Sequence, residues 1–66
     1  MQIHLNGKPR EIPTATTISS LLLELNLGNA AVAVELNGEI LPKEKFSQTL
    51  LNDMDRVEMV QFVGGG

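Results

Sequence analysis

The 66-residue sequence contains no cysteine, tryptophan or tyrosine and only two phenylalanines. The absence of cysteine excludes disulfide bonds, cysteine-ligated zinc and thiol catalysis. Basic residues are also few, with five Lys and Arg against eight Asp and Glu, so no basic surface for nucleic acid is expected. The N-terminal residues contain no basic segment followed by an apolar run, which predicts neither a signal peptide nor a membrane span and favours a cytoplasmic protein.

The length sets a further limit. Sixty-six residues form one domain with a single hydrophobic core and leave no room for a separate catalytic lobe. The fractions of hydrophobic residues (42%) and charged residues (20%) are typical of a folded domain and not of a disordered chain. At ~0.05–0.15 kcal/mol per residue, we expect a free energy of unfolding of roughly 3–10 kcal/mol.

Alternating apolar residues and β-branched side chains predict five short strands. The predicted strands cover residues 1–5, 8–12, 31–36, 39–41 and 56–62. Asn6-Gly7 and Asn37-Gly38 are typical of tight turns, because Asn and Gly adopt positive φ at low cost. Pro9 cannot donate a hydrogen bond to a neighbouring strand and therefore places its strand at an edge of the sheet.

One main helix is predicted over residues 18–25, with Thr17 as its N-cap and Gly28 as the residue that ends it. Its apolar stripe consists of Ile18, Leu21, Leu22 and Leu25. Residues 42–46 resemble a single helical turn that begins with proline. This order of elements predicts an α+β fold of the β-grasp (ubiquitin-like) type. In this fold one main helix and a short helical turn pack on a mixed sheet of four to five strands. We expect a single domain over residues 1–63 and a flexible glycine tail over residues 64–66.

The order of elements and the C-terminal Val63-Gly64-Gly65-Gly66 together resemble the ThiS family of sulfur carriers. The likeness also covers Ile3–Gly7, the Thr17-Ile18 helix start with its leucine stripe and, most specifically, residues 32–42. The resemblance implies a carrier that serves thiazole formation in thiamin biosynthesis. Two positions depart from the family pattern. A polar or basic residue is more usual at Leu36, and some relatives carry alanine at Gly64, but neither position touches Gly65-Gly66.

The chemistry of such a carrier centres on the Gly66 carboxylate. A free carboxylate is a poor electrophile, so adenylation with ATP must first supply a leaving group. The sequence has no phosphate-binding Gly-Lys-Ser/Thr loop and no nucleophile beside a base. We therefore expect no catalytic residue and no bound cofactor in this chain, with ATP used by a separate adenylating enzyme. Gly64 and Gly65 free the backbone to thread a partner's active site. The Gly66 thiocarboxylate is then an anionic nucleophile that needs no adjacent base.

The resemblance implies three partners: a ThiF-like adenylating enzyme, a sulfur donor system such as a cysteine desulfurase, and a ThiG-like thiazole synthase. Two other functions stay open at this point. A related ubiquitin-like carrier or modifier, such as the small subunit of molybdopterin synthase, would share the fold and the C-terminal glycines. A non-covalent β-grasp binding module would carry the same glycines as a frayed end.

The last strand predicts a docking surface. Val57 and Met59 fit the buried phase, which places Glu58, Val60 and Phe62 on the opposite face. Exposed apolar side chains beside a reactive C-terminus are typical of a recognition surface, although they could instead cover a neighbouring strand or loop.

The other candidate residues favour ordinary structural roles. His4 has no second ligand at a suitable spacing, so no metal site is expected. Asp53 and Asp55 are interpreted as turn residues that accept backbone hydrogen bonds, and not as an acid–base pair.

Overall fold

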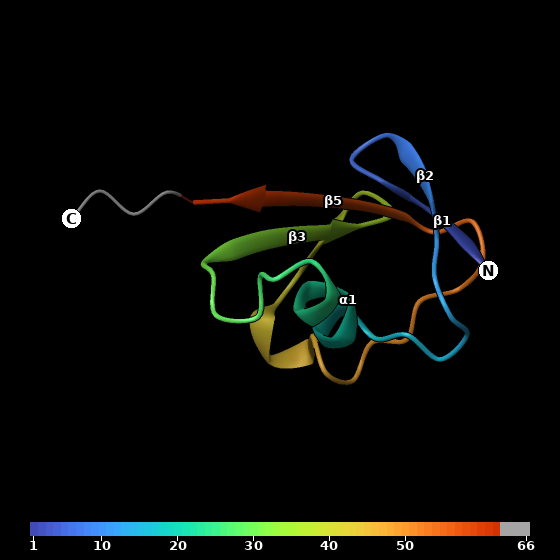
Figure 1. Cartoon of the computed structure of the whole chain (residues 1–66). Coiled ribbons are helices and arrows are strands. Elements are labelled where there is room, and N and C mark those ends of the chain that lie inside the picture. Colours follow the sequence, from blue (N-terminus) through green and yellow to red (C-terminus); the bar gives the residue numbers. More distant parts are fainter. Residues whose placement is uncertain (63–66) are drawn as a thin grey trace.

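The computed structural model describes residues 1–62. The predicted tail, Gly64–Gly66, and the predicted domain boundary at Val63 lie outside these residues. Five strands, one α-helix and one 3₁₀ helix follow one another in the predicted order (Figure 1). Their bounds are β1 Gln2–Leu5, β2 Lys8–Glu11, α1 Ile18–Glu24, β3 Val32–Leu36, β4 Glu39–Leu41, η1 Lys43–Lys45 and β5 Arg56–Gln61.

The five strands form one mixed sheet in the order β2-β1-β5-β3-β4. The last strand in sequence, β5, is therefore the central strand. It runs parallel to β1, with His4 beside Arg56 and Leu5 beside Val57, and antiparallel to β3. Helix α1 lies across one face of this sheet (Figure 1). This arrangement confirms the predicted α+β fold of the β-grasp type.

Both Asn-Gly dipeptides form the predicted two-residue turns. The φ angles are 50° and 82° at Asn6 and Gly7, and 52° and 86° at Asn37 and Gly38. Two successive residues in the left-handed region are what a type I′ hairpin turn requires. Strand β2 lies at the edge of the sheet, as Pro9 predicts.

The N-terminus of α1 has the predicted Thr17 cap. The Thr17 hydroxyl oxygen accepts a hydrogen bond from the Ser20 backbone N–H at 3.1 Å, and the Thr17 N–H donates to the Ser20 hydroxyl at 2.8 Å. Two N–H groups that the helix itself leaves unpaired are thereby satisfied, in the manner of a capping box. The capping hydroxyl of Ser20 takes the place that Glu or Gln more often occupies.

The prediction that Gly28 ends the helix is wrong. The left-handed residue that stops it is Asn26, with φ 61°. The Asn26 N–H donates to Leu23 O at 3.0 Å, and the Leu27 N–H donates to Leu22 O at 2.8 Å. These two bonds form the Schellman pattern, which satisfies carbonyls at the end of a helix. Gly28 instead leaves room for Leu23, whose Cδ2 would lie only 2.7 Å from a Cβ at that position.

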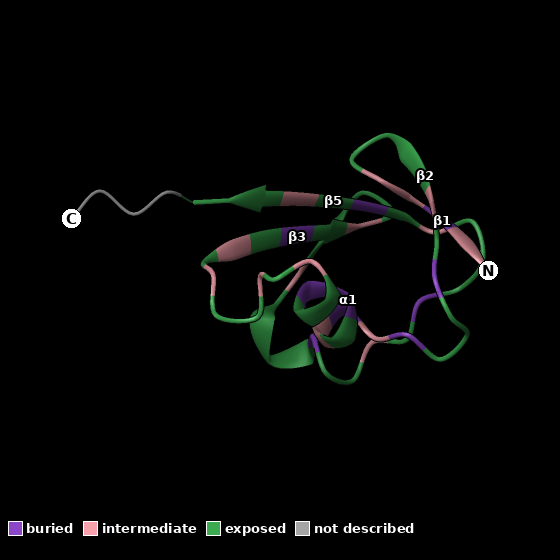
Figure 2. Cartoon of the chain, viewed as in Figure 1, coloured by how far each residue is buried: buried purple, intermediate pink, exposed green. Residues whose placement is uncertain are grey.

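The hydrophobic core lies between α1 and the face of the sheet that the helix covers (Figure 2). Phe46, which follows η1, packs into it. The buried apolar residues are Ile3, Ile12, Ile18, Leu21, Leu22, Val34, Phe46, Leu51 and Val57. Within residues 1–62, no helix lies over the opposite face of the sheet (Figure 1).

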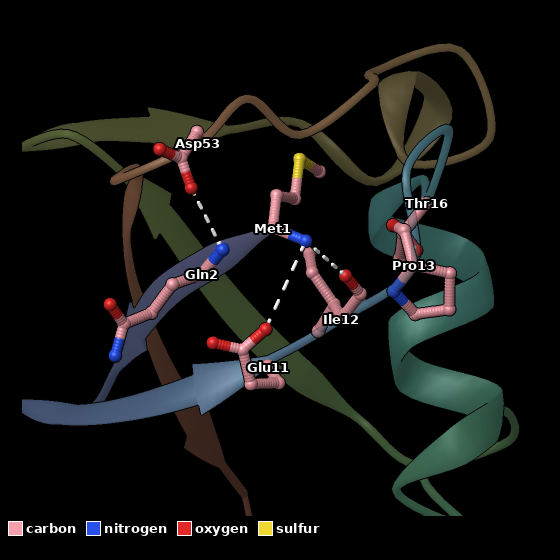
Figure 3. A network of polar contacts seen from close by, with 7 residues as sticks. All are labelled: Met1, Gln2, Glu11, Ile12, Pro13, Thr16 and Asp53. Atoms are coloured by element: carbon pink, nitrogen blue, oxygen red, sulfur yellow. Dashed lines mark hydrogen bonds and ion pairs between the residues drawn. The ribbon is translucent and has the colours of Figure 1, made fainter.

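Polar contacts hold the start of β1 to segments on two sides (Figure 3). The Met1 amino group donates to Ile12 O at 2.9 Å and lies 4.0 Å from a carboxylate oxygen of Glu11. The Gln2 N–H donates to Asp53 Oδ1 at 2.8 Å. Asp53 therefore uses its carboxylate to bind backbone, which confirms the interpretation of this residue as structural.

No helix within residues 1–62 is both long enough and apolar enough to cross a bilayer.

Candidate functional site

The site is built on β5, the strand that leads to the C-terminal glycines. Val57 is fully buried and Met59 is half-buried against the core, as the strand alternation predicts. Glu58, Val60 and Phe62 are exposed, and Val60 and Phe62 each expose 59% of their surface. The predicted outward position of these three residues is therefore confirmed. Within residues 1–62, the neighbouring strands and loops leave more than half of Val60 and of Phe62 uncovered.

The neighbouring strands extend this surface. Pairing of β3 with β5 places Ala33 beside Val60 and Glu35 beside Glu58, and pairing of β4 with β3 places Ile40 beside Glu35. Residues directly opposite each other in adjacent strands point to the same face. Ile40 exposes 80% of its surface and Ala33 is also exposed. We call this set the docking face: Ala33, Glu35, Ile40, Glu58, Val60 and Phe62.

Ala33 and Ile40 were not identified from the sequence as part of the docking surface. Their strands were predicted, but which side of β3 faces the helix depends on the pairing with β5. The sequence did contain one signal. If Val34 is assigned to the buried side of its strand, its neighbours Ala33 and Glu35 must point outward, and the structure buries Val34.

The charges on the docking face are unbalanced. Glu35 and Glu58 are direct cross-strand neighbours, and no basic group of residues 1–62 forms an ion pair with either of them. Together with Gly38 and Arg56 they line a hollow of about 160 Å³ in the sheet surface. Like charges in this position repel each other, which weakens the sheet slightly. A basic group from another molecule would relieve that repulsion.

The turn asparagines fix β5 in place. The Asn37 N–H donates to Arg56 O at 2.8 Å, and Asn37 Oδ1 accepts from the Arg56 N–H at 2.9 Å. Asn37 Nδ2 also donates to Asp55 Oδ1 at 3.0 Å, while Asp55 Oδ2 accepts from the Asn52 N–H at 2.8 Å. Asp55 is therefore a turn residue, as predicted.

Asn6 fixes β5 farther along the strand. Its backbone N–H donates to Val57 O at 2.9 Å, and its Oδ1 accepts from the Met59 N–H at 2.7 Å. The sequence predicted Asn6 only as a turn residue. Its second role depends on a strand more than fifty positions away.

The remaining candidates are the three C-terminal glycines and His4. The predicted reactive residue, Gly66, and the threading residues Gly64 and Gly65 lie outside the described residues, so their roles stay predictions. His4 is half-buried on β1 beside Arg56. No group of three His, Cys, Asp or Glu within residues 1–62 is placed to hold a metal ion.

A second hollow, of about 260 Å³, lies on the helix side of the molecule between α1 and η1. Its walls are mostly apolar, with one hydroxyl from Ser19 and one amine from Lys43. It is lined by Ser19, Leu22, Leu23, Gly28, Lys43 and Phe46.

Comparison with known proteins decides the family. A sequence model described as the ThiS family matches residues 3–66, which include the terminal glycines. The chain belongs to the ThiS family. The resemblance drawn from the terminal glycines and residues 32–42 is thereby confirmed.

The chain is similar both to proteins of about its own length and to part of longer ones. It is 45% identical to the sulfur carrier protein ThiS of Bacillus subtilis, over 97% of this chain and 98% of that protein. It is also 42% identical to a thiazole synthase of Paramagnetospirillum magneticum over all of its own length, but it spans only 20% of that longer protein. The crystal structure of the thiamine biosynthesis protein ThiS from Geobacter metallireducens has 40% identity and a TM-score of 0.84, with full coverage of both chains.

Proposed function

We propose that this protein is a sulfur carrier whose Gly66 carboxylate is adenylated by a partner enzyme, converted to a thiocarboxylate and used as the sulfur source for thiazole formation in thiamin biosynthesis. The observation that carries the proposal is the match to the ThiS family through the C-terminal glycines, residues 3–66. The likeness to a sulfur carrier of almost the same length supports it. The protein is then a co-substrate of other enzymes and not an enzyme.

The proposed chemistry first activates the Gly66 carboxylate and then replaces one of its oxygens with sulfur. First, a Gly66 carboxylate oxygen attacks the α-phosphorus of ATP and pyrophosphate leaves, which gives an acyl-adenylate. Second, a persulfide or sulfide sulfur attacks the carbonyl carbon, and AMP leaves with the oxygen that it had gained. A persulfide donor must then be cleaved by a thiol, which leaves the sulfur on Gly66 as a thiocarboxylate. Glycine at this position offers no Cβ to hinder either attack.

The proposed partners are a ThiF-like adenylating enzyme, a sulfur donor system such as a cysteine desulfurase, and a ThiG-like thiazole synthase. The likeness to part of a thiazole synthase supports a functional link with the last of these. The sequence contains no phosphate-binding Gly-Lys-Ser/Thr loop. ATP is therefore assigned to the adenylating enzyme.

We assign partner recognition to the docking face. Val60 and Phe62 stand next to the residues that the partner must reach, and exposed apolar clusters are common recognition surfaces. Glu35 and Glu58 add unpaired negative charge to this surface. The net charge of −3 favours approach to a basic partner surface.

Mass spectrometry tests the carrier function. Protein isolated from cells that are making thiamin should include a form in which one oxygen at Gly66 is replaced by sulfur, located by fragmentation of the C-terminal peptide. The same measurement on the intact protein establishes whether Gly66 is its last residue. A non-covalent binding module would never carry this modification, even when its partners are abundant.

Blocking the C-terminus tests the mechanism. Removal of Gly66, or a tag that stays attached after it, should abolish acyl-adenylate formation with the purified adenylating enzyme, whereas the same tag at the N-terminus should allow it. Both C-terminal variants should unfold like the unmodified protein, because the buried core is untouched. Adenylation of the C-terminally tagged protein would contradict the mechanism.

A further inference from the structure

The central strand β5 loses one of its two neighbours before it ends. Its pairing with β1 stops at Leu5 beside Val57, because the chain turns away at Asn6-Gly7. Its pairing with β3 continues four residues farther, to Gln61 beside Val32. In Figure 1 the end of β5 that leads to the C-terminus lies along β3, away from the β1–β2 hairpin. Although β5 is the central strand, the second half of it is therefore paired on the β3 side only, and its other side is an open edge.

The hydrogen bonds show which backbone groups face this edge. On the β3 side, the Phe62 N–H donates to Ala31 O at 2.9 Å and the Asn37 N–H donates to Arg56 O at 2.8 Å. Antiparallel pairing alternates, so the even-numbered residues of β5 bond to β3 and the odd-numbered residues point to the other side. Val57 O and the Met59 N–H on that side are bonded by Asn6.

Two groups beyond Asn6 have no such partner. Residues 1–62 supply no hydrogen bond to Met59 C=O or to the Gln61 N–H, which come next on the odd-numbered side. An acceptor and a donor from successive odd residues match the backbone groups of one extended strand. On this side of β5 the hydrogen bonds within the protein thus end at Asn6, before the strand itself ends.

The ordinary edges of the sheet are protected and this one is not. Strand β2 carries Pro9 and three charged residues in four positions, and β4 has only three residues. Proline, charge and short length are the devices that keep strand edges from pairing with other chains. Residues 59–62 read Met-Val-Gln-Phe and contain neither proline nor charge.

We propose that the adenylating enzyme adds an extended strand of its own to β5 at this edge, bonding to Met59 C=O and the Gln61 N–H. The proposal rests on the proposed function and specifies how the partner grips the chain. Strand addition uses main-chain hydrogen bonds for affinity. A strand added here would pair immediately before residues 63–66 and so set the direction in which they enter the active site.

This contact is independent of the docking face. Side chains stand roughly perpendicular to a sheet, whereas the added strand lies in its plane. Val60 and Phe62 can therefore contact one part of the partner while Gln61 pairs with another. A substitution that removes only the Gln61 N–H separates the two contacts.

The test compares Gln61→Pro with Gln61→Ala in titrations against the purified ThiF-like adenylating enzyme. Both variants lose the side chain, but only proline lacks the N–H and places its ring at the open edge. Gln61 does not donate to β3, so proline is tolerated here as at other strand edges. We expect Gln61→Pro to bind roughly tenfold more weakly than Gln61→Ala, since a paired backbone group is lost. N-methylglutamine at this position, introduced by chemical synthesis, provides the same test if the proline variant fails to fold.

Amide hydrogen exchange provides a second measurement on the unmodified protein. The Gln61 N–H should exchange rapidly in the free protein and become strongly protected in the complex. Equal affinities for the proline and alanine variants, or an unprotected Gln61 N–H in the complex, would overturn the proposal. So would protection in the free protein that rises with concentration, because the edge would then pair two copies of this chain.

These outcomes are separate from those that test the carrier function. If the unmodified protein is adenylated at Gly66 but the two Gln61 variants bind alike, the carrier function stands and strand addition is wrong. If the unmodified protein is never adenylated, the proposed function itself fails.

Discussion

Truncation of Phe62 should reduce partner binding more than it reduces folding stability. Phe62 exposes 59% of its surface. An aromatic side chain buries about 150–250 Å² when fully covered, so about 120 Å² remains for a partner to cover. At ~25 cal/mol per Å² this area is worth about 3 kcal/mol, or roughly 150-fold in affinity, as an upper value. The part of Phe62 that is already covered in the free protein limits the loss of folding stability to at most about 2 kcal/mol.

The assay is calorimetric titration of Phe62→Ala into the adenylating enzyme, with urea unfolding of the free variant alongside it. Leu23→Ala is the matched control, because Leu23 exposes 68% of its surface but lies on α1, on the covered side of the sheet. Both substitutions remove an exposed apolar side chain. We expect a 10- to 150-fold loss of affinity, on the scale of known binding hot spots, for Phe62→Ala only.

Two results would refute this reasoning. If Phe62→Ala binds as tightly as the unmodified protein, the exposed apolar end of β5 is not the recognition surface. If Leu23→Ala weakens binding as much as Phe62→Ala does, the partner covers the helix side, and the docking face is assigned to the wrong face of the sheet.

Three further predictions concern folding, each checked by thermal or urea unfolding. Thr17→Ala removes the helix cap and should cost about 1 kcal/mol, with Thr14→Ala, an exposed threonine outside the cap, close to neutral. Leu21→Ala empties a fully buried position and should cost about 2–5 kcal/mol, so a variant that unfolds at the same urea concentration would contradict the assignment of Leu21 to the core. Glu35→Gln relieves the cross-strand repulsion and should add about 0.2–1 kcal/mol, a gain that shrinks in high salt and that Glu44→Gln on η1 should not reproduce.

Local patterns in the sequence were sufficient for most of the fold. The leucine stripe predicted the buried side of α1, and the Asn-Gly dipeptides predicted both hairpin turns. The alternation in the last strand also predicted that Val60 and Phe62 are exposed. In each case the deciding interaction lies within a few residues in the sequence, so it leaves a readable pattern.

The remaining features depend on partners that are distant in sequence. The repulsion between Glu35 and Glu58 exists only because of the register between β3 and β5. The bond from the Met59 N–H to Asn6 likewise joins opposite ends of the chain. The end of α1 was mispredicted for another reason. Both Asn26 and Gly28 can adopt left-handed φ, and local preference favours glycine, but the two Schellman hydrogen bonds place the left-handed residue at Asn26.

The position of β5 between β1 and β3 has a mechanical consequence. When an enzyme pulls on the chain beyond Phe62, the load runs along β5, perpendicular to its hydrogen bonds with both neighbours. In this shearing geometry the hydrogen bonds resist together, whereas a terminal strand at a sheet edge can be peeled away one bond at a time. If a partner draws the C-terminal residues into a channel, as proposed, the domain should therefore stay folded while they enter and leave.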